Sequence, residues 1–437
     1  MRFFNNFFSL FNRFIIVQPD QYVGCLNYKN YFKNLLFYIF SAKFKGVIKT
    51  VLYLIVKIIL DIFKLFVFPI SLVIYFTKIR FIQLNYFQIG IVSHQLNAMV
   101  KNHLLNKKIP VICIPKSHSR SYIKKIFKNL IIIDNIFFNI ILLPFINTDF
   151  ISSKPDNVES FFKNKKLERT SKSFYTDIVT TFEKNNTKDP FVFSEKYIKM
   201  MIDYKDKYFN NFNLKNTFVL HLRDENYIKT SYLRSATAEN YFPAIEMLLE
   251  SNHQIIRIIH SKSKKLEFTK NYKEINIDDF QNQLFQFYLL SNCKGFLCCH
   301  SGPGPLGSLL KTPILELNLF PLDFTYALKK GDIFVPKKIK DANNNYVKYK
   351  KIFSSTLKYV SSIKQIYKYQ LKAEENSSDE IMEAVKEFIC NLRDRSVVAD
   401  SENYTHFKNN FLKDSEIRFA NGQISEYFLK KNHNLFL

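Results

Sequence analysis

Three glycines crowd into one short segment of a 437-residue chain that contains only nine glycines. Residues 295–313 read GFLCCHSGPGPLGSLLKTP, where Gly302, Gly304 and Gly307 follow an apolar run of strand length. Leucines at helical spacing and a second apolar run come next, which predicts strand, tight turn, short helix and strand. Such a turn presents backbone N–H groups and the positive end of a helix dipole to an anion such as phosphate.

We therefore expect this turn to contact a phosphate through His300, Ser301, Gly302, Pro303 and Gly304. The alternative is a tight β–α turn without a ligand, because many such turns need glycine only to close.

A second polar group ends another predicted strand. Residues 216–225, NTFVLHLRDE, begin as a strand and end in charge. His221 and Arg223 alternate along it, so both are expected to face one side of the sheet. An arginine at the carboxyl end of a strand suits a pyrophosphate, because its planar guanidinium binds two oxygens at once. An Arg–Asp salt bridge that closes the loop is the alternative.

Other polar residues follow neighbouring predicted strands. Arg234 lies in the loop after Arg223, and His260 and Ser261 follow the apolar run at 255–259. We include all three among the candidate residues for binding a diphosphate or nucleotide. A general base would be needed to activate an acceptor hydroxyl, and the candidates are Asp224, Glu225 and His94, with Arg223 as a further catalytic candidate. The sequence favours none of the three bases.

The elements that must position these residues alternate between strand and helix. Residues 216–320 predict four strands and three helices, and parallel strands would place the loops after residues 222, 259 and 299 on one edge. In the first half, strands are expected at 87–92, 111–114 and 130–133, with helical spacing at 117–128. The fold class expected is α/β, with two Rossmann-like doubly wound domains that face each other across a cleft.

Composition suggests four regions. Residues 1–80 form a basic, apolar, membrane-associating segment with 11 Lys/Arg against 2 Asp/Glu. Residues 81–210 are the expected N-terminal, acceptor-side Rossmann-like domain with connecting helices. Residues 211–335 are the expected C-terminal, donor-binding Rossmann-like domain, and residues 336–437 a C-terminal helical extension.

The apolar stretch at 51–76 is long enough to span a bilayer, but Lys57, Asp61 and Lys64 interrupt it. This favours a helix that lies in the membrane interface at the cytoplasmic face, with a single span or a buried apolar helix as the alternatives.

Several classes of protein are disfavoured. The net charge of +25 comes from lysines spread along the chain, without a zinc finger or RNP-type motif, so no nucleic-acid partner is expected. The six cysteines form no C-x-x-C pair, which fits a reduced compartment. Neither D-x-D nor H-E-x-x-H occurs, so we expect no metal site and no cofactor.

Four segments together resemble a bacterial family of predicted glycosyltransferases, whose second domain is similar to that of fucosyltransferase-type enzymes with the GT-B architecture. These segments are FVLHLRDENY, YLRSATAENYFPAIEMLLESNHQIIRI, FLCCHSGPGPLGSLLKTPILELN and ENSSDEIMEAVKEF. The resemblance implies that His221, Arg223, Ser301 and Gly302 contact the donor diphosphate. It matches Arg234 and Arg257 to arginines of the family. The chain departs from the family at His260-Ser261, where a glycine-acid pair is usual. It also departs near the first strand, where the family has a glycine-histidine pair: here Gly90 is present, but the histidine, His94, lies further along the chain.

The function expected from these observations is a metal-independent glycosyltransferase. Its partners would be a nucleotide-diphosphate sugar donor, a glycan or lipid-linked acceptor of the cell surface, and the membrane surface. Two alternatives are a polysaccharide-modifying transferase of another group, such as pyruvyl, and a non-catalytic membrane-bound envelope scaffold.

Overall fold

The computed structural model describes residues 77–83, 89–114, 122–135, 138, 175–185, 188–224, 232–268, 270–323, 325–359, 363–395, 402–412 and 415–436. The predicted membrane-associating segment, up to residue 76, and Glu225 lie outside these residues. In the part of the chain that is described, no helix combines the length and the hydrophobicity needed to cross a bilayer.

The chain divides into two compact units. The first contains a parallel three-stranded sheet in the order β1 (Ile79–Gln83), β2 (Ile109–Cys113) and β3 (Ile131–Ile133). The second consists of residues 88–98, 125–129 and 174–437 and contains the larger sheet. Parallel strands interspersed with helices make both units α/β, as the sequence predicts.

The prediction of a strand at residues 87–92 is wrong. Helix α4 (Ile89–Leu105) begins there, and the first strand of the small sheet is β1, which lies earlier in the chain. Buried residues recur along α4 at helical spacing, at Ile89, Val92, Leu96 and Val100. The short apolar run therefore belongs to a longer pattern of period 3.6, which decides between strand and helix.

The larger sheet is parallel throughout, with the strand order β12-β9-β8-β7-β4-β5-β6. The expected strands are confirmed as β4 (Thr217–His221), β5 (Gln254–Ile259), β7 (Gly295–Cys299) and β8 (Ile314–Leu319). Every residue of β4, β7 and β8 is buried, as is usual for central strands covered by helices on both faces. The remaining strands are β6 (Tyr272–Asn276), β9 (Ile333–Pro336) and β12 (Gln423–Ile424).

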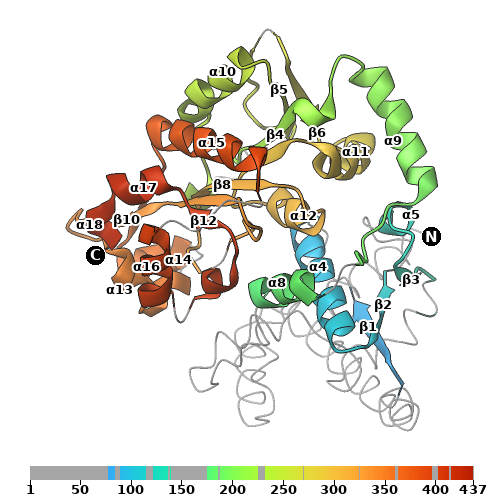
Figure 1. The fold of residues 1–437 in the computed structure, drawn as a ribbon, viewed down its shortest axis with the longest axis horizontal. Helices are drawn as coiled ribbons and strands as arrows, with labels where there is room; N and C mark the ends of the chain where they lie inside the picture. The colour runs from blue at the N-terminus through green and yellow to red at the C-terminus, as the bar shows by residue number, and fades with distance from the viewer. Residues whose placement is uncertain are drawn as a thin grey trace, which may run out of the picture. The chain divides into compact units, whose positions relative to one another are not determined.

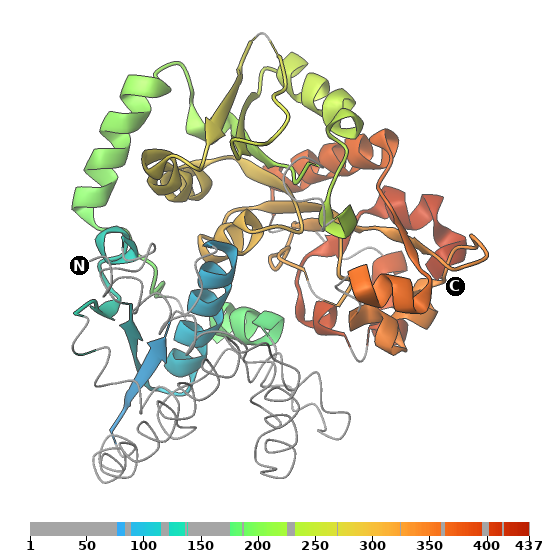
Figure 2. The same cartoon turned by 180° about the vertical axis from the view of Figure 1, so that it is seen from behind.

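Helices cover both faces of this sheet. Helices α10 (Phe242–Glu250) and α15 (Ser378–Arg393) lie on one face, and α11 (Phe280–Asn292) and α12 (Pro303–Leu309) lie on the other (Figure 1). Helix α9 (Glu195–Tyr208) packs beside α11, as the view from behind also shows (Figure 2), and the Tyr197 hydroxyl donates to the Leu284 carbonyl at 2.7 Å. Helix α12 begins at Pro303, two residues before the Pro305 that its sequence suggests.

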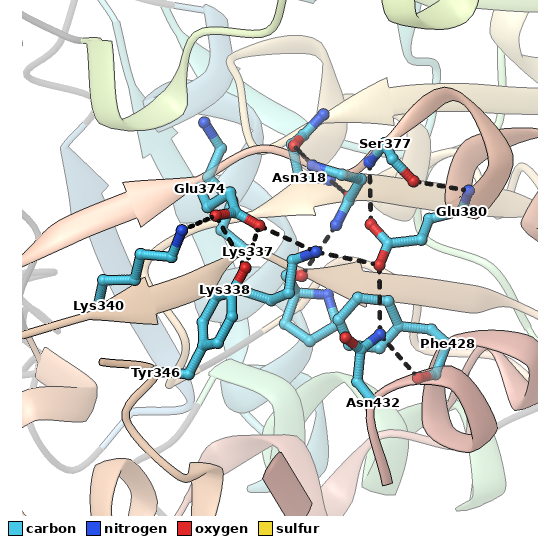
Figure 3. A network of polar contacts seen from close by, with 12 residues as sticks. Asn318, Lys337, Lys338, Lys340, Tyr346, Glu374, Ser377, Glu380, Phe428 and Asn432 are labelled. Atoms are coloured by element: carbon cyan, nitrogen blue, oxygen red, sulfur yellow. Dashed lines mark hydrogen bonds and ion pairs between the residues drawn. The ribbon is translucent and has the colours of Figure 1, made fainter. Parts of the chain in front are cut away.

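Helix starts follow the capping residues in the sequence. Helix α15 begins with a capping box: the Ser377 hydroxyl accepts from the Glu380 N–H, and the Glu380 carboxylate accepts from the Ser377 N–H at 2.9 Å (Figure 3). Ser194 caps α9 and Asp279 caps α11 by a single bond each, in which the side chain accepts from the backbone N–H of Tyr197 or Asn282. Such caps satisfy backbone donors that have no partner inside the helix.

Smaller elements complete the described fold. They are α5 (Ile123–Ile126), α8 (Tyr175–Asn185), β10 (Lys338–Lys340), α13 (Tyr349–Phe353), α14 (Ile363–Tyr369), β11 (Lys372–Glu374), α16 (Glu402–Phe411), α17 (Glu426–Lys431) and α18 (His433–Phe436).

Candidate functional site

The strand order of the larger sheet contains a topological switch point. Counted from β4 as the first strand, β6-β5-β4-β7-β8-β9 is the order 3-2-1-4-5-6. Ligands of open parallel sheets bind at the carboxyl ends of the strands, where this order reverses. Here that position lies between β4 and β7, the two strands that end in the predicted polar residues.

The ends of these two strands are bonded to each other. The Arg223 backbone N–H donates to the Cys299 sulfur at 3.2 Å, and the Arg223 carbonyl accepts from the Ala236 N–H at 2.9 Å. The first bond fixes the exit of β4 against the exit of β7, next to Ser301, which is buried. The second holds the loop that carries Arg234. Arg223, Arg234 and the glycine turn are therefore brought together.

Gly302 also contacts the first turn of α4. A β-carbon added to Gly90 would lie 2.5 Å from the Gly302 Cα and 2.7 Å from its carbonyl oxygen. The two backbones thus touch directly, with room for no side chain on Gly90. Gly304 is equally confined, because a β-carbon there would lie 2.6 Å from the Tyr326 ring.

His300 forms a buried pair with Glu316. Its Nδ1 lies 2.7 Å from Glu316 Oε1, and both side chains are almost fully buried. The other carboxylate oxygen accepts from the Thr325 hydroxyl at 2.6 Å and from the Tyr326 N–H at 2.8 Å. The Tyr326 ring stacks on His300 with 4.8 Å between ring centroids. This set of bonds fixes the imidazole directly beside Ser301.

Electrostatic effects place Arg234 close to the same group. Burial and the Glu316 carboxylate raise the pKa of Tyr326 well above its usual value, and the positive charge of Arg234 opposes them. The charge of Arg234 therefore lies near Tyr326, whose ring stacks on His300.

His94 lies in α4 and stacks on Tyr175, with 3.9 Å between ring centroids. Burial, together with the nearby His300, lowers its pKa to about 4. The imidazole is therefore neutral at physiological pH. Because its pKa lies far below the operating pH, His94 is a weak proton acceptor for an acceptor hydroxyl.

The predicted salt bridge of Asp224 has a different partner. Asp224 Oδ2 pairs with Arg257 at 3.3 Å, and Arg257 also pairs with Glu274 at 2.8 Å. Arg257 is fully buried within β5, so the pair ties the loop after β4 to the neighbouring strands. His221 is buried as well, with its Nδ1 3.0 Å from the Ile258 carbonyl, and burial lowers its pKa to about 3.

His260 and Ser261 are held by Asp278 at the exit of β5. The carboxylate accepts from the Ser261 N–H at 2.8 Å and hydroxyl at 2.5 Å, and lies 2.9 Å from His260 Nδ1. These hydrogen bonds lower the pKa of Asp278 to about 2. At the end of β5, which is two strands away from β7, both side chains thus contact the carboxylate of Asp278.

Two residues of this sheet edge were not expected. Lys337 follows β9 and is buried, and its ammonium donates to the Ser235 carbonyl at 2.8 Å. Glu375 accepts from the Thr237 N–H at 2.7 Å in the same loop. In the sequence, Lys337 is one of many lysines in a basic stretch, and nothing local marks it as buried.

A cavity of about 240 Å³ also lies in the second unit, among α8, the end of α12 and the loop before β9, and Tyr326, whose ring stacks on His300, is one of its lining residues. Of the predicted site residues, none lines it. Its polar groups bond to the surrounding protein: the Thr312 hydroxyl donates to the Leu290 carbonyl at 2.7 Å, and Asp332 pairs with Arg395 at 2.6 Å. We therefore place the site at the switch point and not in this cavity.

No family model matches the sequence, and no curated protein matches it. Three solved structures match parts of the chain, each with low identity and a TM-score below 0.5. A glycosyl transferase family 9 protein from Veillonella parvula DSM 2008 has 10% identity and a TM-score of 0.44, covering 72% of this chain and 98% of that one. The ADP-heptose lps heptosyltransferase II of E. coli has 10% identity and a TM-score of 0.32, covering 55% and 84%.

The UDP-GlcNAc 2-epimerase of Methanocaldococcus jannaschii has 16% identity and a TM-score of 0.24, covering 54% of this chain and 67% of that one. Two of these three neighbours are glycosyltransferases. The similarity to fucosyltransferase-type enzymes stays a prediction from the sequence. These matches assign no role to any residue of this chain.

Proposed function

We propose that the chain is a GT-B-type glycosyltransferase that moves a sugar from a nucleoside-diphosphate sugar to a glycan or lipid-linked acceptor at the cytoplasmic membrane face. The observation that carries the proposal is the bond between Arg223 and Cys299 at the switch point. It holds an arginine and the Ser301–Gly302 turn at one sheet edge, where open α/β folds bind nucleotides.

The chemistry required of this edge is stabilisation of a leaving diphosphate. As the bond from the anomeric carbon to the phosphate oxygen breaks, its electron pair goes to the diphosphate. Arg223 and Arg234 can bind the developing charge in place of a metal, and fixed donors of this kind contribute about 3–4 kcal/mol each to the transition state. We assign no general base among the described residues, because Asp224 is paired and His94 has a low pKa.

Thermal shift with GDP, UDP, ADP, dTDP, CMP and phosphoenolpyruvate tests the proposal. A nucleoside diphosphate at 100 times its Kd should stabilise the folded protein by about 2.7 kcal/mol. Arg223→Ala should abolish the shift, whereas Arg393→Ala, which removes an exposed arginine at the end of α15, should retain it.

The matching sugar nucleotide should then release its nucleoside diphosphate in the presence of EDTA. Stabilisation by phosphoenolpyruvate alone would favour pyruvyl transfer. No shift with any nucleotide would contradict the proposal.

A further inference from the structure

Lys337 and Lys338 are neighbours in sequence with opposite environments. The Lys338 ammonium lies 3.0 Å from Glu374 and 3.2 Å from Glu380, so two carboxylates balance its charge (Figure 3). Lys337 is only 1% exposed and makes no ion pair with any described residue. Its ammonium has one hydrogen bond, to the Ser235 carbonyl at 2.8 Å.

The backbone around Lys337 is firmly held. Its N–H donates to the Leu319 carbonyl at 3.1 Å, and its carbonyl accepts from the Tyr349 hydroxyl at 3.1 Å. The Asn376 amide donates to the preceding Pro336 carbonyl at 3.0 Å, within the network shown in Figure 3. The lysine is therefore fixed in its buried position by the fold on both sides.

A buried ammonium that forms no ion pair is costly, by several kcal/mol. Burial accordingly lowers the pKa of Lys337, although the negative charge of Glu375 offsets part of this effect. A neutral donor would brace the Ser235 carbonyl at lower cost. The charge itself therefore requires an explanation.

The charge of Lys337 acts at the switch point. Burial raises the pKa of Cys299, and the positive charges of Arg223 and Lys337 both oppose this. Arg223 and Lys337 each follow a strand of the parallel sheet, β4 and β9, so both leave the sheet at its carboxyl edge. The Ser235 carbonyl that Lys337 contacts is adjacent to Arg234. Of the three N–H donors of its ammonium, two have no partner among the described residues.

We propose that Lys337 binds the diphosphate group of the nucleotide, as a third cation beside Arg223 and Arg234. This inference rests on the proposed function and adds the residue that follows β9 to a site otherwise built from the ends of β4 and β7. An anion with two or more negative charges would compensate the buried ammonium, and a nucleoside diphosphate carries that charge where a nucleoside does not.

Isothermal titration with the nucleoside diphosphate that gives the largest thermal shift tests this role. Lys337→Met removes the charge, and Lys337→Gln also removes it but keeps a donor for the Ser235 carbonyl. Both variants should bind at least 10-fold more weakly than the wild type. The matched control Lys338→Met should bind within 2-fold of the wild type.

The melting temperature of the ligand-free protein distinguishes a role of the Lys337 charge in binding from a structural role of its hydrogen bond to the Ser235 carbonyl. Removal of an unpaired buried charge should leave the melting temperature of Lys337→Met unchanged or raise it, whereas loss of a structural brace would lower it. Full affinity in Lys337→Gln would show that only the hydrogen bond matters and would overturn the proposal, as would full affinity in Lys337→Met. If the wild type binds no nucleoside diphosphate at all, the proposed function itself fails.

Discussion

Gly90 and Gly302 touch through their backbones, and the contact is asymmetric. A β-carbon on Gly90 would lie 2.5 Å from the Gly302 Cα, whereas a β-carbon on Gly302 would have its nearest neighbour, the Gly90 nitrogen, at 3.7 Å. The first turn of α4 is thereby pressed against the turn that we assign to the diphosphate. Of the two residues, only Gly90 must be a glycine, because a side chain at this position would have no room.

Gly90→Ala should therefore destabilise the protein by about 2–4 kcal/mol, because backbone atoms cannot yield as a flexible side chain can. Urea unfolding measures this change. Gly302→Ala is the control and should change the free energy of unfolding by less than about 1 kcal/mol, since its φ of −52° suits alanine. Equal losses from the two substitutions would contradict the contact.

Arg257→Leu should destabilise the protein by about 3–5 kcal/mol, because it leaves the carboxylates of Asp224 and Glu274 buried without their partner. Chemical denaturation measures the loss. Lys264→Ala removes the partner of Glu239 in an exposed pair and should cost less than about 1 kcal/mol. A small effect of Arg257→Leu would show that Asp224 is not held by this pair, and would restore it as a candidate base.

Glu316→Ala should cost at least about 1–3 kcal/mol, because His300, Thr325 and the Tyr326 N–H would all lose an acceptor in the interior. Glu316→Gln should fold, with the amide nitrogen facing His300 Nδ1 and holding the ring in its Nε2–H form. Nitrogen NMR of the imidazole reports this tautomer. An unchanged His300 spectrum in the glutamine variant would argue against the 2.7 Å pair.

Stability should fall as the pH is lowered from 6.5 toward 5. The pKa of His94 is about 4 and that of His221 about 3 in the folded protein, both below the unfolded value of 6.5. The unfolded chain then binds protons that the folded chain does not, at a cost of up to about 1.4 kcal/mol per pH unit for each histidine. Their contribution is fully present above pH 6.5.

Urea unfolding at pH 7.5, 6.5, 5.5 and 5.0 measures this loss. His94→Gln should reduce the slope of the unfolding free energy against pH by up to about 1.4 kcal/mol per pH unit, the contribution of one proton. A slope identical to that of the wild type would mean that His94 titrates normally in the folded protein.

The central strands of the larger sheet could be predicted because their sequences are mainly apolar, with few interruptions such as Arg257 in β5 and Glu316 in β8. β6 was missed because it lies at the edge, and its sequence YKEIN buries a single residue, Ile275. β12 has only two residues and no pattern of its own. The start of α4 was misassigned because residues 87–92, taken alone, fit a strand as well as a helix.

The candidate site was predictable only where local sequence defines it. The glycine turn and Arg223 each stand at the end of a recognisable strand, so their meeting follows from parallel topology. The partner of Asp224 could not be found in this way, because Arg257 lies 33 residues away in the sequence, on the neighbouring strand β5. Lys337 was missed for a similar reason, since the carbonyl to which its ammonium donates belongs to Ser235, 102 residues earlier.

The position of β12 at the edge of the larger sheet affects how the chain folds during its synthesis. β12 pairs with β9 in parallel, although some 90 residues separate them in the chain. During synthesis from the N-terminus, the ribosome releases β4 to β9 first, so the outer edge of β9 stays open until residue 424 has emerged. A nascent chain that stalls within this interval would present an unpaired strand edge, the kind of surface on which chaperones and aggregation compete.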